Sequence, residues 1–454
     1  MQLSNLNFSN FKNWKNFNTE LTKINLFFGQ NSSGKSSIIQ LILLLKQTIE
    51  NKDEKVVLYF GDDKSYVNLG NFDEVLNKNV KEKVLSIGMS MNFIQDYTFK
   101  IQISKNKSEI VELQTFLAEG DEISIFTQKE PKEKKYSISI KNIESNEITD
   151  NFLTFDINHF YKIAYPGLIN KDGIVTLDQI EAVKEIYKRI KGIEDSIEFL
   201  FSKMIYIGPL RENPKREYKW TATRHSHFGV RGENTFDALI TSIKVNEKYF
   251  SPYFKTEGSL AEIVCKWLIE FGMADDFRIE PISDMKQLFQ VNVKTKGATN
   301  WVDICDVGFG VSQILPIIAL CYYAPQGSII IIEQPEIHLH PKVQSGLGDL
   351  LIDAAVSRNI QFIIESHSEH LLTRIQRRIA EEKIDDKDVK INFCNLIDGE
   401  SVLEELEVDD FGEIINWPEN FFGDEMEEIY QMQNAILKRK LKLAQAETDG
   451  EKLS

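Results

Sequence analysis

Cysteine pairs, long apolar runs and an excess of positive charge are all missing from this sequence of 454 residues. The four cysteines, Cys265, Cys305, Cys321 and Cys394, lie far apart and form no Cys-x-x-Cys pair. Neither a disulfide framework nor a structural zinc site is therefore indicated. No apolar stretch is long enough to span a bilayer, and the first residues lack the pattern of a secretory signal. We expect a cytoplasmic protein with no membrane partner.

The charge balance also limits the function. The formal net charge is −16 at pH 7, which argues against a protein that coats nucleic acid, because affinity for phosphates comes from clustered lysine and arginine. Any contact with DNA is expected to be local. A hydrophobic content of 42% in a chain of this length can form a large core and two or three structural units.

The most specific motif is a phosphate-binding loop, Gly-Gln-Asn-Ser-Ser-Gly-Lys-Ser, at residues 29–36. The apolar run 24–28 predicts a strand before it and residues 37–45 predict a helix after it, which is the setting that the motif requires. Backbone N–H groups and the positive end of the helix suit a polyphosphate, Lys35 adds a charge, and Ser36 offers a ligand for Mg²⁺. A turn that is merely rich in glycine and serine would not need that lysine or that hydroxyl. The predicted binding residues for a nucleoside triphosphate are Gly29, Gln30, Asn31, Ser32, Ser33, Gly34, Lys35, Ser36 and Ser37.

A second group of motifs lies between residues 306 and 370. Residues 328–333 form an apolar run that ends in Glu333, the pattern of a buried parallel strand whose carboxyl end reaches a nucleotide site. A similar run, residues 359–365, leads to His367. Ahead of both, residues 306–316 predict a glycine-containing turn followed by a helix.

Together these motifs resemble the ABC-type ATPases of the AAA family that are related to RecF, SMC and the OLD (overcoming lysogenization defect) proteins. Within that group they most resemble the ATPase subunits of bacterial anti-phage systems of the Septu, Gabija and PARIS type. The resemblance implies an α/β fold, an ABC-type P-loop ATPase head with a mixed sheet, an antiparallel β lobe and a short helical arm insertion. The likeness is carried by residues 10–14, 29–36, 206–214, 307–313, 333–341, 365–368 and 412–422.

The resemblance also implies a site shared between subunits. In such ATPases the phosphate loop of one subunit holds ATP and the glycine signature of another caps it, so ATP joins a homodimer or higher homo-oligomer. Glu333 is then expected to hold Mg²⁺ together with Ser36, and His367 to lie near the γ-phosphate. The partner would contribute Gly308, Phe309, Gly310 and Ser312, with Gly308 standing where the family usually has serine.

The residue after Glu333 departs from the family pattern. An acidic residue commonly aligns the attacking water there, whereas this chain has Gln334, which can orient water but cannot accept its proton. Glutamine orients the water in some GTPases, so hydrolysis is expected to be slow rather than absent. Glu336 is the alternative carboxylate, with capping of the next turn as its alternative role. The sequence leaves open which of Gln334 and Glu336 positions the water.

Four of the seven histidines, His338, His340, His367 and His370, fall in this region and are potential transition-metal ligands. The resemblance assigns their segments to loops that line a nucleotide site, and no cysteine accompanies them. The expected cofactors are therefore ATP and Mg²⁺.

Four segments are expected along the chain. Residues 1–150 form an N-terminal ATPase lobe with an antiparallel sheet, 151–285 a helical arm or insertion, 286–411 a C-terminal ATPase lobe, and 412–454 an aromatic docking segment with a helix at 424–445. Helical spacing over 177–204 predicts the arm, which is too short for a long coiled coil. Basic and aromatic residues interleave at 211–224, as in grooves that follow a nucleic-acid strand, but a loop over the nucleotide or a protein interface gives the same pattern.

The expected function is a regulatory ATPase, turning ATP into ADP and phosphate, that controls a separate effector protein in anti-phage defence. The effector is expected to be a nuclease, because too few residues follow His370 for the TOPRIM nuclease domain of OLD proteins. The expected trigger is DNA or a phage protein. The alternative is a RecF-like repair or recombination ATPase stimulated by DNA, and a transporter motor is a remote third.

Overall fold

The structure is a computed structural model of the chain. It describes residues 2–92, 97–106, 109, 111–119, 123–129, 136–142, 148–149, 153–154, 157–163, 167–168, 177–223, 228–283 and 287–418. The chain divides into one unit at Met1–Ile415 and another at Asn416–Ser454. The helix predicted at 424–445 lies outside the described residues. In the described part, no helix has the length and apolar character needed to cross a membrane.

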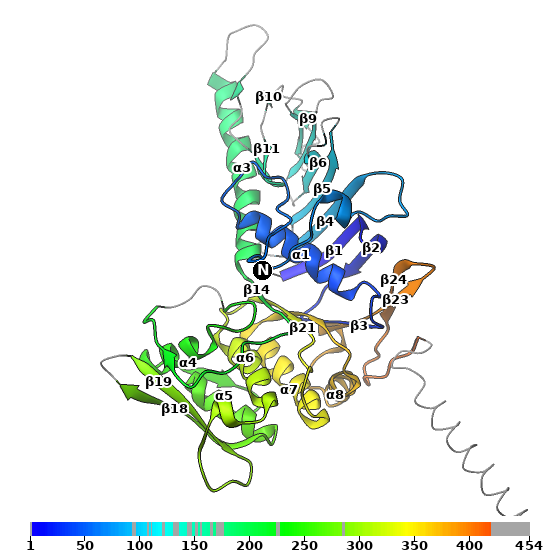
Figure 1. The fold of residues 1–454 in the computed structure, drawn as a ribbon. Coiled ribbons are helices and arrows are strands. Elements are labelled where there is room, and N and C mark those ends of the chain that lie inside the picture. The colour runs from blue at the N-terminus through cyan, green and yellow to red at the C-terminus, as the bar shows by residue number, and fades with distance from the viewer. Residues whose placement is uncertain are drawn as a thin grey trace, which may run out of the picture. The chain divides into compact units, whose positions relative to one another are not determined.

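A six-stranded mixed sheet carries the phosphate loop (Figure 1). Its order is β14-β21-β22-β3-β23-β24, and all neighbours are parallel except β23 and β24. The apolar strands β21 and β22 are buried at nearly every position, as expected for strands covered on both faces. The strands are β3 (Ile24–Gly29), β14 (Met204–Ile207), β21 (Ile329–Glu333), β22 (Gln361–Glu365), β23 (Val389–Ile397) and β24 (Glu400–Leu406).

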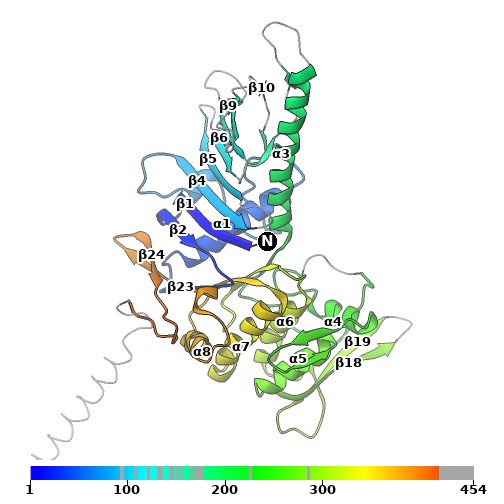
Figure 2. The ribbon, with the colours of Figure 1, turned by 180° about the vertical axis from the view of Figure 1, so that it is seen from behind.

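Helices lie on both faces of this sheet. On one face, α1 (Lys35–Ile49) leaves the phosphate loop and shares a buried core with this sheet and the antiparallel sheet of the N-terminal lobe. On the other face lie α6 (Phe309–Tyr323), α7 (Pro341–Arg358) and α8 (Glu369–Ala380), as Figures 1 and 2 show. Beyond its first two residues α6 is buried almost throughout, which explains why it is apolar all round.

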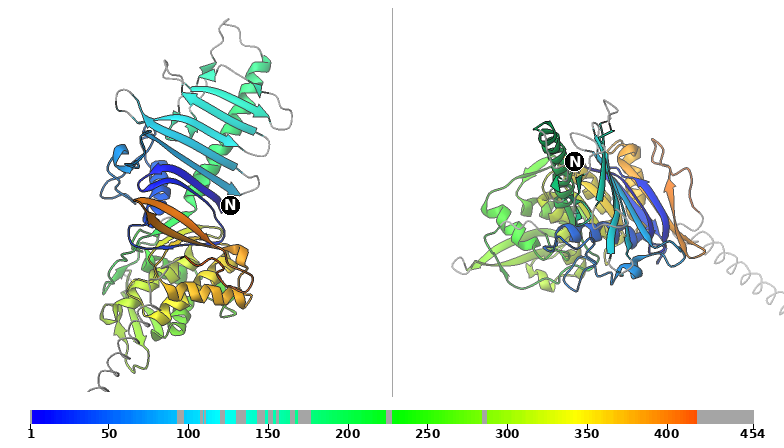
Figure 3. Two further views of the ribbon diagram at one scale, coloured as in Figure 1. Left: turned by 90° about the vertical axis from the view of Figure 1, so that its right-hand side faces the viewer. Right: turned by 90° about the horizontal axis from the view of Figure 1, so that it is seen from above.

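The N-terminal lobe contains an eight-stranded antiparallel sheet in the order β2-β1-β4-β5-β6-β7-β8-β9, seen broadly in the left view of Figure 3. The expected alternating pattern is clear in β5, whose apolar residues are buried between more exposed ones. The elements are β1 (Gln2–Phe11), β2 (Trp14–Glu20), α2 (Phe72–Val75), β4 (Val84–Asn92), β5 (Tyr97–Lys105), β6 (Val111–Glu119), β7 (Ile123–Lys129), β8 (Tyr136–Asn142) and β9 (Ile148–Thr149).

The predicted arm is a single helix, α3 (Leu177–Ser202). Its later turns do not project freely, since Ile190, Ile193, Ile197 and Phe201 are buried in the core shared with α1 and the antiparallel sheet. Directly after α3, β14 pairs with β21 in the six-stranded sheet. The stretch 151–285, expected as one insertion, therefore contributes a strand to the sheet that carries the phosphate loop. Before α3 lie the short strands β10 (Leu153–Thr154), β11 (Ile157–Asn158), β12 (Lys162–Ile163) and β13 (Gly167–Leu168).

A smaller antiparallel sheet and two helices precede α6. The sheet has the order β15-β19-β18, with β20 also paired to β19. Helix α5 begins with a capping box between Ser259 and Glu262, which satisfies two N–H groups reciprocally. The elements are β15 (Tyr218–Lys219), α4 (Thr235–Lys244), β16 (Tyr249–Ser251), β17 (Thr256–Gly258), α5 (Leu260–Glu270), β18 (Ala274–Ser283), β19 (Leu288–Thr295), β20 (Val302–Asp303) and the 3₁₀ turn η1 (Ile304–Asp306). A second 3₁₀ turn, η2 (Asp386–Asp388), lies between α8 and β23.

Candidate functional site

The phosphate loop connects the end of β3 to the start of α1. Gly29 and Gly34 have φ angles of 140° and 98°, which favour glycine. A Cβ at Gly29 would lie 2.1 Å from the carbonyl oxygen of Cys394, and one at Gly34 would lie 2.5 Å from the hydroxyl of Ser401. The loop therefore needs both glycines. No side chain caps the N-terminus of α1, so its first N–H groups are open to an anion.

Lys35 is the first residue of α1, and its side chain folds back along the loop. Its Nζ donates hydrogen bonds to the carbonyl oxygens of Gly29, at 2.9 Å, and Gln30, at 2.7 Å. Burial lowers the pKa of Lys35, and the negative charge of Glu365 opposes that shift. The ammonium group is thus held at the loop.

A polar cavity of about 330 Å³ opens over this loop. It brings the predicted loop, Gln334 and His367 together, and it adds Glu365 and three residues of the N-terminal lobe that the sequence analysis did not select. Gly29, Gln30 and Ser33 do not line it, and Ser33 is buried beneath the loop. The lining residues are Lys12, Asn13, Asn31, Ser32, Gly34, Lys35, Ser36, Ser37, Gln40, Gln334, Glu365 and His367.

Glu365 is the last residue of β22 and is 3% exposed. Its Oε1 accepts a hydrogen bond of 3.1 Å from the hydroxyl of Ser36, while its Oε2 has no hydrogen-bond partner in the described part of the chain. Burial raises the pKa of Glu365, and the Ser36 hydrogen bond and the Lys35 charge oppose the shift. A carboxylate that sequence reasoning had not selected therefore lies at the hydroxyl expected to bind Mg²⁺.

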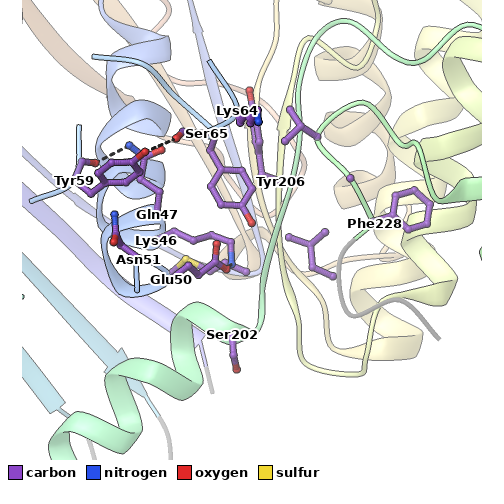
Figure 4. A pocket seen from close by; sticks show the side chains of 15 residues that line it. Lys46, Gln47, Glu50, Asn51, Tyr59, Lys64, Ser65, Ser202, Tyr206 and Phe228 are labelled. Atoms are coloured by element: carbon purple, nitrogen blue, oxygen red, sulfur yellow. Dashed lines mark hydrogen bonds and ion pairs between the residues drawn. The ribbon is translucent and has the colours of Figure 1, made fainter. Parts of the chain in front are cut away.

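Glu333, at the end of β21, has a different hydrogen-bond partner from Glu365. Its Oε1 accepts a hydrogen bond of 2.9 Å from the hydroxyl of Tyr206 on β14, and Glu333 does not line the phosphate cavity. The ring of Tyr206 lines a second cavity, of about 390 Å³, with Lys46 and Gln47 near the end of α1 (Figure 4). The ring of Tyr66 meets that of Tyr206 edge-on. Burial and then the charge of Glu365 raise the pKa of Glu333 to about 7. Its predicted role as a magnesium ligand stays a prediction.

Arg211 holds the backbone that follows Glu333. The side chain is 2% exposed, and its terminal nitrogens donate to the carbonyl oxygens of Pro209 at 2.6 Å and of Glu333 and Gln334 at 3.3 Å. Burial lowers the pKa of Arg211 to about 10, opposed chiefly by the charge of Glu336. One buried guanidinium thus fixes the turn that carries Gln334.

The structure separates Gln334 from Glu336. Gln334 lines the cavity and has a φ of 44°, a strained backbone conformation for a residue with a side chain. Glu336 does not line the cavity, is 8% exposed, and accepts a hydrogen bond of 2.5 Å from the backbone N–H of His367. Burial raises the pKa of Glu336. Glu336 is therefore placed to support the His367 loop, and Gln334 is placed at the cavity.

The glycine signature forms a separate, exposed surface. Helix α6 begins at Phe309, and no atom lies within 4 Å of the position of a Cβ at Gly308. Phe309 is 48% exposed and meets the ring of His338 edge-on, with ring centroids 5.1 Å apart. The hydroxyl of Ser312 donates to the carbonyl oxygen of Phe309 at 2.7 Å. Neither these residues nor Gly310 line the cavity of their own chain, so their predicted role in a partner's site stays a prediction.

The histidines have different local roles. His367 lines the cavity, where burial followed by the Lys35 charge lowers its pKa. His340 caps α7 by accepting a hydrogen bond of 3.3 Å from the backbone N–H of Lys342. Within the described ranges, no group of three or more His, Cys, Asp or Glu side chains is arranged to hold a metal ion by itself.

The basic segment 211–224 contributes to folding at two positions. Arg211 is buried under the acidic turn, and Arg216 makes two hydrogen bonds with Asp306, at 2.9 and 2.8 Å. Residue 224 lies outside the described part. Of the two interpretations of this segment, a loop packed near the nucleotide site agrees better with these contacts than an open basic groove.

Besides the three lining residues Lys12, Asn13 and Gln40, sequence reasoning missed Glu365, Arg211 and Tyr206. Glu365 carried a usable signal, since it ends an apolar strand just as Glu333 does. Tyr206 and Arg211 lie in the stretch 206–214, which carries the family resemblance, and Arg211 also begins the basic segment 211–224, but no motif singles out either residue. Their positions depend on β14 pairing with β21, a contact between residues far apart in sequence.

The phosphate loop lies between a parallel strand and a helix, and an acidic strand lies beyond it in the same sheet. A histidine follows the strand between them, and an antiparallel lobe covers α1. These features define an ABC-type P-loop ATPase. The chain belongs to the AAA family described as "AAA domain, putative AbiEii toxin, Type IV TA system", whose model matches residues 24–373. A second family model, a protein of unknown function (DUF3696), matches residues 384–432. A comparison with curated proteins gave no match.

Solved SMC heads show a distant likeness. The head bound to the C-winged helix domain of ScpA has 10% identity and a TM-score of 0.43, covering 90% of this chain and 98% of that one. The SMC head domain from Thermotoga maritima has 11% identity and a TM-score of 0.38, covering 90% and 100%. The Pyrococcus furiosus head with an extended coiled coil, bound to the C-terminal domain of ScpA, has 12% identity and a TM-score of 0.38, covering 96% and 99%. The fold assignment stands on the strand order and the site.

Proposed function

We propose that this chain is a regulatory subunit that binds ATP, hydrolyses it slowly, assembles through it and controls a separate effector in anti-phage defence. The observation that carries the proposal is the single cavity that gathers the phosphate loop, Gln334, Glu365 and His367. The family description as a putative AbiEii toxin of a type IV TA system supports a defence setting. We propose a nuclease as the effector, and DNA or a phage protein as the trigger.

The loop residues account for binding. The uncapped N-terminus of α1 and the loop N–H groups favour a polyphosphate, and Lys35 is close enough to exchange its two carbonyl partners for phosphate oxygens. The side chains of Ser36 and Glu365 suit a hard cation such as Mg²⁺, which takes oxygen ligands. When bound, that ion supplies positive charge to the β- and γ-phosphates.

Slow hydrolysis is expected because Gln334, an amide rather than a carboxylate, lines the cavity. We propose that Gln334, which lines the cavity, orients the attacking water, and an amide cannot take up the proton. One carboxylate oxygen of Glu336 accepts from the N–H of His367, and Glu336 does not line the cavity. This arrangement supports a long-lived ATP state, which suits a subunit that holds its effector until a signal arrives.

Assembly through ATP is supported by the exposed signature. The first turn of α6 presents Gly308 and Phe309 to solvent rather than to the cavity of its own chain. A second copy placed with its phosphate loop against this turn would complete the site. We therefore propose a homodimer or higher homo-oligomer held by ATP.

The experiment that tests the proposal combines turnover and partner identification. Purified protein is assayed for ATP binding and phosphate release with and without duplex DNA, and the chain is isolated with the products of its neighbouring genes. ATP binding, slow basal turnover and a co-isolated nuclease whose activity changes with ATP are expected. Strong stimulation by duplex DNA alone, without such a partner, would favour the RecF-like alternative. Absence of ATP binding would contradict both.

A further inference from the structure

Two lysine side chains converge beside the signature turn, the first turn of α6 at residues 308–310. A Cβ at Gly272, which follows the C-terminal end of α5, would lie 3.2 Å from Nζ of Lys342 and 3.4 Å from Nζ of Lys296. Both lysines are exposed, and neither forms an ion pair within the part of the chain that the structure describes. Two like charges this close repel each other and favour an anion between them.

The lysine pair, Lys296 and Lys342, lies at the edge of the signature turn. Met273 directly follows Gly272, and its Cε would lie 3.0 Å from a Cβ at Gly310. The carbonyl oxygen of residue 338 would lie 3.5 Å from the same Cβ, and Lys342 follows that segment in the first turn of α7. The flexible stem of a lysine lets its ammonium group reach across the neighbouring surface. An anion at the signature turn is therefore within the reach of this pair.

The signature turn offers no charged side chain of its own to a phosphate. Gly308, Phe309 and Gly310 carry no polar side chain, and the hydroxyl of Ser312 donates to the carbonyl oxygen of Phe309 at 2.7 Å. A second copy that approaches with bound ATP brings a polyphosphate to a chain whose net charge is already −16. Positive charge on this surface would offset the resulting repulsion, and most strongly at low salt.

We propose that Lys296 and Lys342 contact the phosphates of the ATP bound to a second copy of the chain. The proposal rests on the ATP-driven assembly proposed above, and it adds two residues that no motif selects. Lysine binds phosphate as a point charge and does not need the planar geometry of an arginine contact. ATP would then meet Lys35 of the copy that binds it and the lysine pair of the copy that caps it.

Removing both charges tests the proposal. ATP affinity and ATP-driven association are measured for the parent, for the double variant Lys296→Gln with Lys342→Gln, and for Lys383→Gln, an exposed control after α8. The double variant should keep parental ATP affinity as a single copy but associate about tenfold or more weakly, because charged contacts to phosphate are lost. Its association should also depend less on salt. The control should match the parent.

Three results would decide against the proposal or its basis. Parental association of the double variant would overturn the role of the pair. Weaker ATP binding by the double variant as a single copy would overturn it too, because the lysines would then act on the nucleotide of their own chain. A parent that shows no association with ATP would instead contradict the proposed function.

A mixture of variants shows directly whether the lysines act across copies. Lys35→Ala retains the lysine pair, and the double variant retains the phosphate loop. At a protein concentration at which the parent associates and neither variant does, the mixture should associate with ATP, because one complete site can form between the two copies. If the lysines served their own chain, the mixture would contain no complete site. A mixture that stays unassociated would therefore overturn the proposal.

Duplex DNA is the other source of phosphate that could meet this lysine pair. The affinity for a short duplex is measured for the parent and the double variant in the absence of ATP, and the two values should agree. Weaker DNA binding by the double variant, with ATP-driven association unchanged, would assign the pair to nucleic acid and overturn the proposal.

Discussion

At the scale of single residues, Lys35 combines ligand binding with a local structural role. Lys35→Ala should lower ATP affinity by about 100-fold or more, because a charged contact to phosphate is lost. The side chain also binds two loop carbonyls, so the loop itself should become less protected from hydrogen exchange. Lys23→Ala, which removes a surface ion pair with Asp388, is the matched control and should bind ATP normally. Equal ATP affinity in Lys35→Ala and the parent, by titration with a fluorescent ATP analogue, would contradict the site.

The roles of Gln334 and Glu336 are separable by single-turnover hydrolysis. Gln334→Glu should speed hydrolysis, because it places a base at the cavity, while parental turnover should lie well below the ~1 to 100 per second of kinase-like transfer. Glu336→Gln retains the shape of the side chain and should leave the rate of the chemical step nearly unchanged. The reason is that Glu336 contacts the His367 backbone and does not line the cavity. No gain from the first variant and a large loss from the second would identify Glu336 as the base and remove the reason for a long-lived ATP state.

Glu333 should make folding stability depend on pH. Its pKa rises from 4.5 to about 7 in the folded protein, so the folded state holds the proton longer than the unfolded state. The contribution of Glu333 to the free energy of unfolding should therefore fall as pH rises from 4.5 through 7. Glu333→Gln cannot ionise and therefore lacks this loss. Its free energy of unfolding in urea, relative to that of the parent, should increase by up to about 3 kcal/mol between pH 5 and pH 8. The exposed Glu257→Gln serves as the control. An equal difference at both pH values would refute the burial argument.

At the scale of elements, the first turn of α6 offers a test that leaves the phosphate loop intact. A Cβ at Gly310 would meet the flexible end of Met273 at 3.0 Å, and one at Gly308 would meet nothing within 4 Å, so both positions tolerate a side chain. Gly310→Arg and Gly308→Arg should keep parental ATP affinity but lose ATP-driven association, because they block the surface that a partner's nucleotide would approach. Gly192→Arg, on α3 and also in open space, is the control for added bulk and charge. Loss of ATP affinity in the α6 variants would place this turn in the site of its own chain.

Some of these elements can be predicted from the sequence, and others cannot. The β3, loop and α1 unit and the strands β21 and β22 follow from local patterns, because glycine placement and continuous apolar runs determine them over a few residues. The role of β14 was not visible, since its four residues follow directly on α3 and only pairing with β21 reveals them as part of the sheet. Arg211 was missed for the same reason, because strand order sets its neighbours and a single sequence does not give strand order. Glu365 ends a predicted strand, which is a usable signal, but only the strand order shows that this strand lies beside β3.

At the scale of the whole molecule, the proposed nucleotide site is built from two copies of the chain. Lys35→Ala leaves the α6 surface unchanged, and Gly310→Arg leaves the phosphate loop unchanged. A pair made of one copy of each variant would therefore contain one site in which an intact loop faces an intact signature turn. A pair made of two copies of the same variant would contain no such site.

Sedimentation of a mixture of these two variants tests the central claim most directly. In Mg²⁺ and ATP, each variant alone should remain unassociated, and the mixture should form a complex that contains both and falls apart when ATP is removed. The parent, run beside them, should associate with ATP. A parent that associates with ATP while the mixture does not would contradict a shared site, and a parent that shows no ATP-dependent association would contradict assembly through the nucleotide.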